Sequence, residues 1–99
     1  MSRLQVDAIN LLAKKYFADD AEVYLFGSRV DDNQKGGDID LFIRSKNTEL
    51  LNLEKKVLFL TELKKQIGDQ KIDVVFDTVR TRARTAFYNS IVQHAVLLF

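Results

Sequence analysis

The chain has 99 residues, of which 46% are hydrophobic and 29% are charged, and its formal net charge is +1. It is too apolar for a disordered chain, and its near-neutral charge argues against nucleic acid as a partner. It has no cysteine and a single histidine, which excludes disulfides and zinc sites built from thiolates or several histidines. Any bound metal must therefore have oxygen ligands.

Targeting signals are missing from the sequence pattern. The first residues lack the apolar core of a signal peptide, and no window approaches the ~20 apolar residues of a membrane span. We therefore expect a soluble cytoplasmic protein without a membrane partner. Because the length suits one domain and no Pro-rich or Ser-rich linker interrupts it, we expect a single domain over residues 1–99.

Hydrophobic periodicity predicts the elements of the first half of the chain. Apolar residues at helical spacing predict a helix from the N-terminus to about Phe17. The β-prone run 23–26 predicts a short strand that ends in a Gly-Ser turn, and the polar residues 31–37 are typical of a loop. Residues 38–43 alternate between polar and apolar, which predicts a half-buried strand.

The second half of the chain continues the alternation of helices and strands. Residues 48–67 predict a helix closed by a glycine. Residues 71–76 alternate between polar and apolar as residues 38–43 do, and they predict a second strand of the same kind. An N-cap at Asp77 or Thr78 predicts a final helix to about residue 93, followed by a terminal strand over 95–99.

The helix predicted over residues 48–67 has a wide apolar surface. One stripe holds five apolar residues, namely Leu50, Leu53, Val57, Leu60 and Ile67. Four more lie outside it, namely Leu51, Leu58, Phe59 and Leu63. This arc exceeds the ~100° that packing on a core requires. Either the helix is deeply buried, or the surface around Leu51, Leu58 and Phe59 binds a partner or a second copy of the chain.

Three aspartates are predicted to share one face of the sheet. Because side chains alternate across a strand, Asp38 and Asp40 point to the face opposite Ile39. Asp73 likewise points away from the face of Ile72, so the three carboxylates gather if the two strands are neighbours. We expect no basic neighbour beside them. Like charges this close destabilise a fold unless a divalent cation neutralises them, and Mg²⁺ suits such oxygen ligands.

Each of these features also has a purely structural interpretation. An Asp-X-Asp on a strand is common on a solvated face, and Gly27-Ser28 could serve only as a turn and a cap instead of approaching a phosphate. Arg29 follows that turn and could reach a triphosphate, although exposed arginines are common. The arginines at 80, 82 and 84 favour a solvated face over a phosphate contact, and His94 favours a structural or surface role.

The combination of motifs resembles one family. Phe26-Gly27-Ser28-Arg29, nine residues between Ser28 and Asp38, Gly36-Gly37-Asp38-Ile39-Asp40-Leu41 and a lone Asp73 are similar to the signature of the DNA polymerase beta nucleotidyltransferase superfamily. The likeness is greatest to its minimal nucleotidyltransferases. The resemblance implies a small α/β (α+β) domain, with a mixed β-sheet, helices packed on one face and the acidic site on the other.

The resemblance also implies a set of site residues. Gly27 and Ser28 would hold the triphosphate, with Arg29 beside them. Asp38 and Asp40 would bridge two Mg²⁺ ions, and Asp73 would complete the metal site that activates the attacking hydroxyl. The implied reaction transfers a nucleoside monophosphate, most simply AMP from ATP, to a hydroxyl of a macromolecular acceptor.

The resemblance leaves two main hypotheses, which differ in whether the protein modifies its partner or only binds it. Minimal nucleotidyltransferases are commonly paired with a helical HEPN-type ribonuclease toxin, so the resemblance implies an antitoxin that adenylylates such a partner. The alternative is a non-catalytic nucleotide-binding antitoxin or adaptor that neutralises its partner by direct contact. An RNA-modifying transferase is a third possibility, and the near-neutral charge weakens it.

Overall fold

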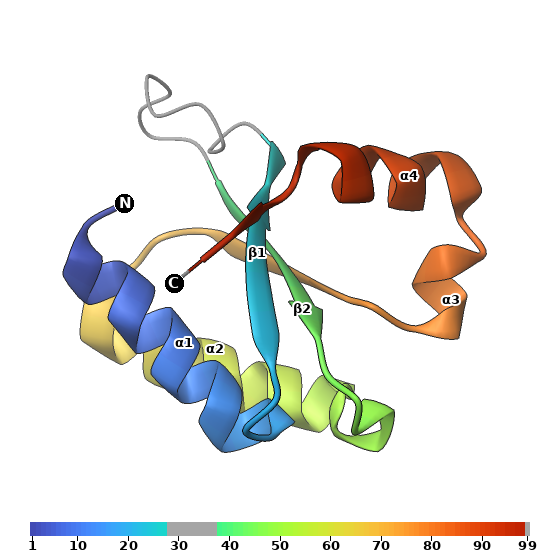
Figure 1. The fold of residues 1–99 in the computed structure, drawn as a ribbon. Helices are drawn as coiled ribbons and strands as arrows, with labels where there is room; N and C mark the ends of the chain where they lie inside the picture. Colours follow the sequence, from blue (N-terminus) through green and yellow to red (C-terminus); the bar gives the residue numbers. More distant parts are fainter. Residues whose placement is uncertain (28–37, 99) are drawn as a thin grey trace.

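A four-stranded mixed β-sheet forms the centre of the protein (Figure 1), in a computed structural model that describes residues 1–27 and 38–98. Its strand order is β3-β2-β1-β4. The strands are, in chain order, β1 Glu22–Phe26, β2 Ile39–Arg44, β3 Ile72–Phe76 and β4 Val96–Leu97. β1 is antiparallel to β2 and to β4, whereas β2 is parallel to β3. The predicted fold class, a small mixed sheet with helices, is confirmed.

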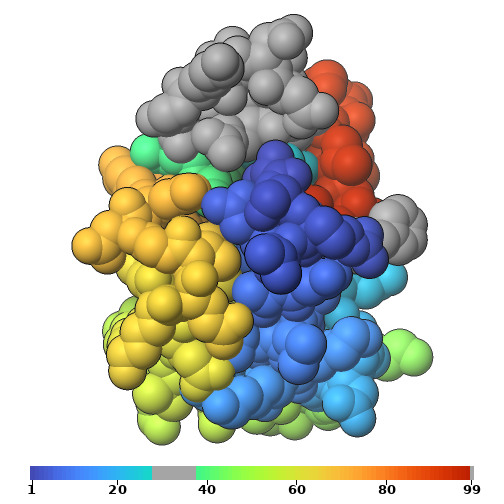
Figure 2. Space-filling view, turned by 90° about the vertical axis from the view of Figure 1, so that its left-hand side faces the viewer, coloured from blue at the N-terminus to red at the C-terminus, as the bar shows by residue number. Residues whose placement is uncertain are grey.

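Helices cover the sheet from both sides. In chain order they are α1 Arg3–Phe17, a 3₁₀ turn at Thr48–Leu50, α2 Leu53–Ile67, α3 Val79–Arg82 and α4 Thr85–His94. α1 and α2 lie side by side over one face, while α3 and α4 lie on the opposite side of the sheet (Figure 1). The space-filling view shows α1 and α2 packed against each other as one layer (Figure 2). Among residues 1–27 and 38–98, no helix is long and apolar enough to cross a membrane.

The first helix follows its sequence signals. Ser2 caps it by accepting a hydrogen bond from the backbone N–H of Gln5, while the Gln5 side chain accepts from the N–H of Ser2. This reciprocal pair satisfies two donors that a helix start leaves free. The buried side chains of the helix are Ile9, Leu12, Ala13 and Phe17. The helix ends where predicted, at Phe17.

The second helix differs from the prediction in its start and in the face it buries. α2 begins at Leu53 rather than near Thr48, because Asn52 accepts a hydrogen bond of 2.8 Å from the Lys55 N–H. Leu51 therefore belongs to the preceding turn, where it is 7% exposed, and Phe59 is fully buried in the core. The expectation that Leu51 and Phe59 form part of a binding surface was wrong.

The exposed apolar side chains of α2 are instead Leu53, Val57 and Leu58, at 72%, 52% and 43% of their full exposure. The helix therefore buries Phe59 and Leu63 and leaves part of the stripe predicted for the core in contact with solvent. A helix covered on one side only by α1 and the sheet cannot bury an arc as wide as this sequence offers.

The predicted final helix is divided into two. Thr78 caps α3 by accepting a hydrogen bond from the Thr81 N–H, and α3 ends after four residues. Arg84 has φ −86° and ψ 72°, outside helical geometry, and α4 restarts the helix at Thr85. The spacing of apolar residues in the sequence continues through Arg84 and therefore does not predict this single non-helical residue. The terminal strand is shorter than predicted, and Phe99 lies outside the described residues.

The two faces of the sheet have different chemistry. The face toward α1 and α2 is aliphatic, and its fully buried members are Val23, Ile39, Leu41 and Ile43. The opposite face carries polar and aromatic side chains that alternate with them. α4 covers part of this second face, since the Tyr88 ring lies 6.1 Å from the ring of Phe42, which is only 2% exposed. The acidic site therefore lies beside a helix.

Candidate active site

The alternation of β2 and β3 brings acidic side chains together on the second face. Asp40 and Asp73 are register partners in the parallel pair, and Asp38 lies two residues before Asp40 at the start of β2. The neighbouring partners Ile39 and Ile72 point into the core, where they are 0% and 5% exposed. The prediction that the three carboxylates lie on one face of the sheet therefore agrees with the observed register.

The carboxylates of Asp38 and Asp73 act electrostatically on Asp40. The pKa of Asp40 is raised, first because burial disfavours its charged form and then because Asp73 and Asp38 add negative charge nearby. Lys71 acts in the opposite direction on the same carboxyl group. Of the three acids, Asp73 is exposed while Asp38 and Asp40 are half-buried. Asp40 is therefore the acid for which a neutralising cation would matter most.

Lys71 corrects the expectation that the acids have no basic neighbour. Its Nζ lies 3.5 Å from Oδ2 of Asp38. The two residues lie next to each other because the Ile39 N–H donates a hydrogen bond of 3.0 Å to the Lys71 carbonyl, just where β2 and β3 begin to pair. The Lys71 side chain is 73% exposed, so this ion pair contributes little to stability.

Gly27 lies against the acid cluster. Its φ of +76° is in the left-handed region that favours glycine, and a Cβ atom built on it would collide with Oδ2 of Asp40. The end of β1 therefore approaches the Asp40 carboxylate more closely than any other residue type would allow. Ser28, Arg29 and the predicted loop over 31–37 lie outside the described residues.

The donor chemistry of this cluster fits a divalent cation. In the described ranges, no group of three or more His, Cys, Asp or Glu side chains is already arranged to hold a metal ion. The residues that are present nevertheless offer oxygen donors: Asp40, raised in pKa, adjoins Asp38 and Asp73, and Gly27 brings the end of β1 close to its Oδ2. Hard cations such as Mg²⁺ prefer such carboxylates, usually completed by substrate phosphates and water.

A cavity opens beside the acids. It has a volume of about 600 Å³ and is lined on the acid face by Phe26, Asp40, Asp73, Val75 and Phe87, and it continues around the edge of β3. Phe26 is the antiparallel register partner of Asp40, so its side chain lies on the same face. The sequence pattern alone predicts no role for Phe87. The signal that could have indicated it is the aromatic pair Phe87-Tyr88 on a helix predicted to follow the third strand.

A second ionic cluster lies further along the same face. The carboxylate of Asp77, which is 3% exposed, accepts hydrogen bonds of 2.8 Å from Nε of Arg44 and from Nε of Arg82. Burial raises its pKa, but the two hydrogen bonds and the two positive charges outweigh burial and the net pKa is lowered. Asp77 is therefore a buried ion-pair partner, and Thr78 is the helix cap. The arginines at 80, 82 and 84 are exposed as predicted, and Arg82 in addition pairs with Asp77.

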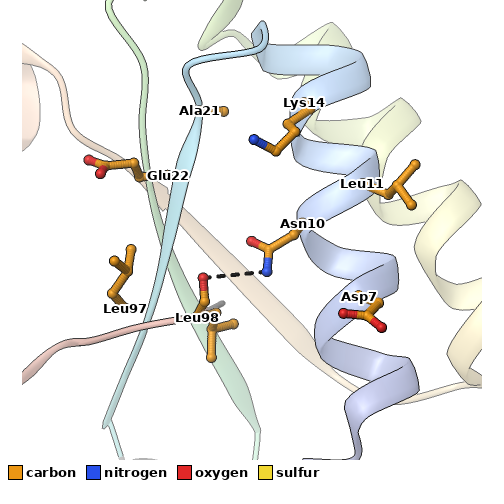
Figure 3. Close-up of a pocket in the computed structure, with 8 residues that line it drawn as sticks. All are labelled: Asp7, Asn10, Leu11, Lys14, Ala21, Glu22, Leu97 and Leu98. Atoms are coloured by element: carbon orange, nitrogen blue, oxygen red, sulfur yellow. Dashed lines mark hydrogen bonds between the residues drawn. The ribbon is translucent and has the colours of Figure 1, made fainter.

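A separate hollow of about 570 Å³ lies between α1 and the β1–β4 edge of the sheet (Figure 3). Asn10 and Leu98 meet there, through a hydrogen bond of 3.4 Å from Nδ2 to the backbone carbonyl. Its described lining residues do not include Asp38, Asp40 or Asp73. The hollow is therefore not part of the acid site.

Comparison with known proteins gives one match. The family model described as "Polymerase beta, Nucleotidyltransferase" matches residues 8–99. The matched region contains the end of β1, both acidic strands and α4. No curated protein matches the chain at a significant level.

Proposed function

Because the chain belongs to the polymerase beta nucleotidyltransferase family, we propose that it transfers AMP from ATP to a hydroxyl of a macromolecular acceptor, using two Mg²⁺ ions. Membership supports nucleotidyl transfer in general, and the choice of ATP and of Mg²⁺ is our proposal. One observation carries it: Asp40 and Asp73 are partners on one face of the sheet, with Gly27 in contact distance of Asp40.

The roles of the residues follow from their order across the sheet. Gly27, at the end of β1, lets the chain approach a phosphate, and we assign Ser28 and Arg29 to the same triphosphate. Asp38 and Asp40 on β2 would hold both metal ions, and Asp73 on β3 would hold the one on the acceptor side. When bound, such ions lower the pKa of the attacking hydroxyl and stabilise the leaving pyrophosphate.

The reaction itself is a displacement at the α-phosphorus. The acceptor oxygen forms a bond to this phosphorus and gives its proton to water. The bond from the phosphorus to the oxygen that bridges the α- and β-phosphates breaks, and pyrophosphate leaves with that oxygen. Catalysis of this kind depends mainly on position and on charge neutralisation. Rigid strands suit that task, because β2 and β3 hold Asp40 and Asp73 in fixed register.

We further propose that the acceptor is a helical HEPN-type ribonuclease and that the chain acts as its antitoxin. Exposed apolar side chains on the layer formed by α1 and α2 support a protein partner. They are Leu53 and Val57 on α2, and Leu4 and Leu11 on α1, which are 82% and 70% exposed. Large apolar side chains left exposed on both helices of a small domain are a feature that a protein partner would cover. The same surface would also suit a second copy of the chain.

The second candidate is an antitoxin that neutralises its partner by contact alone. The exposed apolar residues of α1 and α2 favour it equally, because they would bind a partner without any chemistry. The two candidates differ in whether the acid site is needed. A contact antitoxin would neutralise its partner just as well after Asp38→Asn with Asp40→Asn.

Calorimetry tests the metal-dependent site. Wild-type protein should bind ATP in Mg²⁺ and lose most of that affinity in EDTA, and the variant with Asp38→Asn and Asp40→Asn should bind weakly in both. Asp19→Asn is the matched control, since Asp19 is an exposed aspartate in the turn that precedes β1. Equal ATP affinity with and without Mg²⁺ would refute the proposed site.

A further inference from the structure

Two phenylalanines form an apolar wall beside the acids. The rings of Phe26 on β1 and Phe87 on α4 lie with centroids 6.4 Å apart at an interplanar angle of 80°, an edge-to-face contact. Both side chains are half-buried. Phe26 shares the face of its register partner Asp40, so the two phenylalanines lie directly beside the acids.

The wall and the acids share one cavity. Phe26, Phe87, Asp40 and Asp73 all line the part of the hollow on the acid face. The whole hollow of about 600 Å³, which also includes the part around the edge of β3, lies in the roughly 300–1,000 Å³ range of small-molecule sites. A pocket with an apolar wall at one end and convergent carboxylates at the other suits a ligand that has a planar ring and a charged, metal-binding group. A nucleoside triphosphate has this shape.

The order of the strands indicates whether the triphosphate or the acceptor lies beside Phe26 and Phe87. Phe26 directly precedes Gly27 on β1, whereas Asp73 lies on β3, on the other side of β2. The triphosphate end of the site is therefore the end that carries the two phenylalanines. Arg84 also lies at this end of the site, where its guanidinium carbon is 4.3 Å from the centroid of the Phe87 ring.

We propose that Phe87, supported by Phe26, packs against the nucleobase of the incoming triphosphate and so positions its α-phosphate over Asp40. This inference rests on the proposed function and adds the subsite that recognises the base. Stacking of a base on an aromatic ring tolerates any base, so the wall supplies affinity more than selectivity. Phe87 is a positioning residue, because it contacts no reacting atom.

Two ligands separate the base from the phosphates. In calorimetry with Mg²⁺, ATP carries both groups and inorganic tripolyphosphate carries the phosphates alone. Phe87→Leu, which keeps apolar volume and removes the ring, should weaken ATP binding by about tenfold and leave tripolyphosphate binding unchanged. Phe87→Tyr should restore the ATP affinity. Val92→Ala, at an exposed position of the same helix, is the matched control and should change neither.

Four results would overturn the assignment. Equal weakening of both ligands by Phe87→Leu would show a general effect on the fold, which a lowered melting temperature would accompany. Unchanged ATP affinity with slower transfer would show that the wall contacts the acceptor instead. If wild-type protein binds neither ligand in Mg²⁺, the proposed function fails and the base subsite fails with it. Tripolyphosphate binding without any added affinity for ATP would refute the base subsite alone.

Discussion

Asp40 and Asp73 are register partners across the parallel strands β2 and β3, and the charge of Asp73 contributes to the raised pKa of Asp40. The two carboxylates nevertheless differ in their surroundings, because Asp40 is half-buried beside Gly27 while Asp73 is exposed at the edge strand. The fold thus gives the two paired acids different surroundings, and the proposed mechanism uses that difference.

Asp73→Asn should separate binding from transfer. Asp73 would contact only the metal ion beside the attacking hydroxyl, so its role should appear mainly in the transition state. We expect Mg²⁺-ATP affinity within about tenfold of wild type and a loss of at least ~100-fold in transfer rate. Calorimetry and single-turnover assays measure the two quantities. Transfer at the wild-type rate would show that the third acid is not part of the mechanism.

Asp40→Asn should stabilise the metal-free protein at neutral pH. A carboxyl group whose folded pKa is raised costs stability as the pH rises above its unfolded pKa near 4, and the cost is complete above the folded pKa. Because Asp40 is only half-buried, we expect a gain of no more than about 1 kcal/mol, or a few degrees in Tm.

Thermal melts in EDTA at pH 7 and well below the unfolded pKa, at about pH 2, test this expectation. The gain should be present at pH 7 and absent at the lower pH, where both states of the wild-type carboxyl group are protonated. Mg²⁺ should raise the Tm of wild type more than that of the variant. A variant less stable than wild type in EDTA at pH 7 would show that Asp40 is not under repulsion.

Gly27→Ala should harm both the fold and the site. The new Cβ atom would meet the Asp40 carboxylate, and the positive φ adds backbone strain, so we expect a loss of about 1–3 kcal/mol and weaker ATP binding. Gly68→Ala is the matched control: its φ is +94°, but nothing lies within 4 Å of an added Cβ. It should lose stability by strain alone and bind ATP normally. Equal ATP affinity in both variants would separate Gly27 from the site.

Asp77→Ala should destabilise the protein without a direct effect on the acids. The change leaves Arg44 and Arg82 without their shared partner, and since both are partly exposed to water we expect a loss of about 2 kcal/mol. The pKa of Asp77 is lowered in the folded state, so its contribution is present above pH 4 and is lost as the pH falls below it. Denaturation curves of both proteins should therefore converge in acid. Curves that stay equally far apart at pH 7 and pH 3 would contradict this.

Val57→Glu combined with Leu53→Glu should break the complex with a helical partner. Both side chains are exposed and apolar on α2, so the change adds charge to the proposed interface at little cost to the fold. Light scattering of the mixture measures the complex. Gln66→Glu, at another exposed position of α2, should leave it intact. An unchanged complex with a well-folded double variant would place the interface elsewhere.

The acid face could be predicted from the sequence because it depends on a fixed period. Side chains in a strand alternate by two, so Asp38 and Asp40 share a face whatever the rest of the chain does. That Asp73 shares this face with them follows if the two strands are neighbours, which they are, whereas its direct pairing with Asp40 depends on the register. The order of strands and helices follows similarly from local hydrophobic patterns.

Contacts that depend on register and tertiary packing could not be predicted in this way. Lys71 lies beside Asp38 only because the parallel strands pair in this register, and nothing in the local pattern specifies it. The start of α2 depended on Asn52, one of several residues able to cap a helix there. Phe87, whose ring meets that of Phe26, lies on α4, which begins only after the non-helical residue Arg84. The helical pattern of the sequence does not indicate this break.

Label transfer from ATP tests the central claim most directly. The protein is incubated with Mg²⁺, ATP labelled at the α-phosphate and a HEPN-type ribonuclease, and the denatured acceptor is then examined for covalent label. We predict label with wild-type protein and with Asp19→Asn, and none with Asp38→Asn and Asp40→Asn combined or with EDTA. Absence of label while wild type forms a stable complex and neutralises the ribonuclease would contradict nucleotidyl transfer and leave neutralisation by contact.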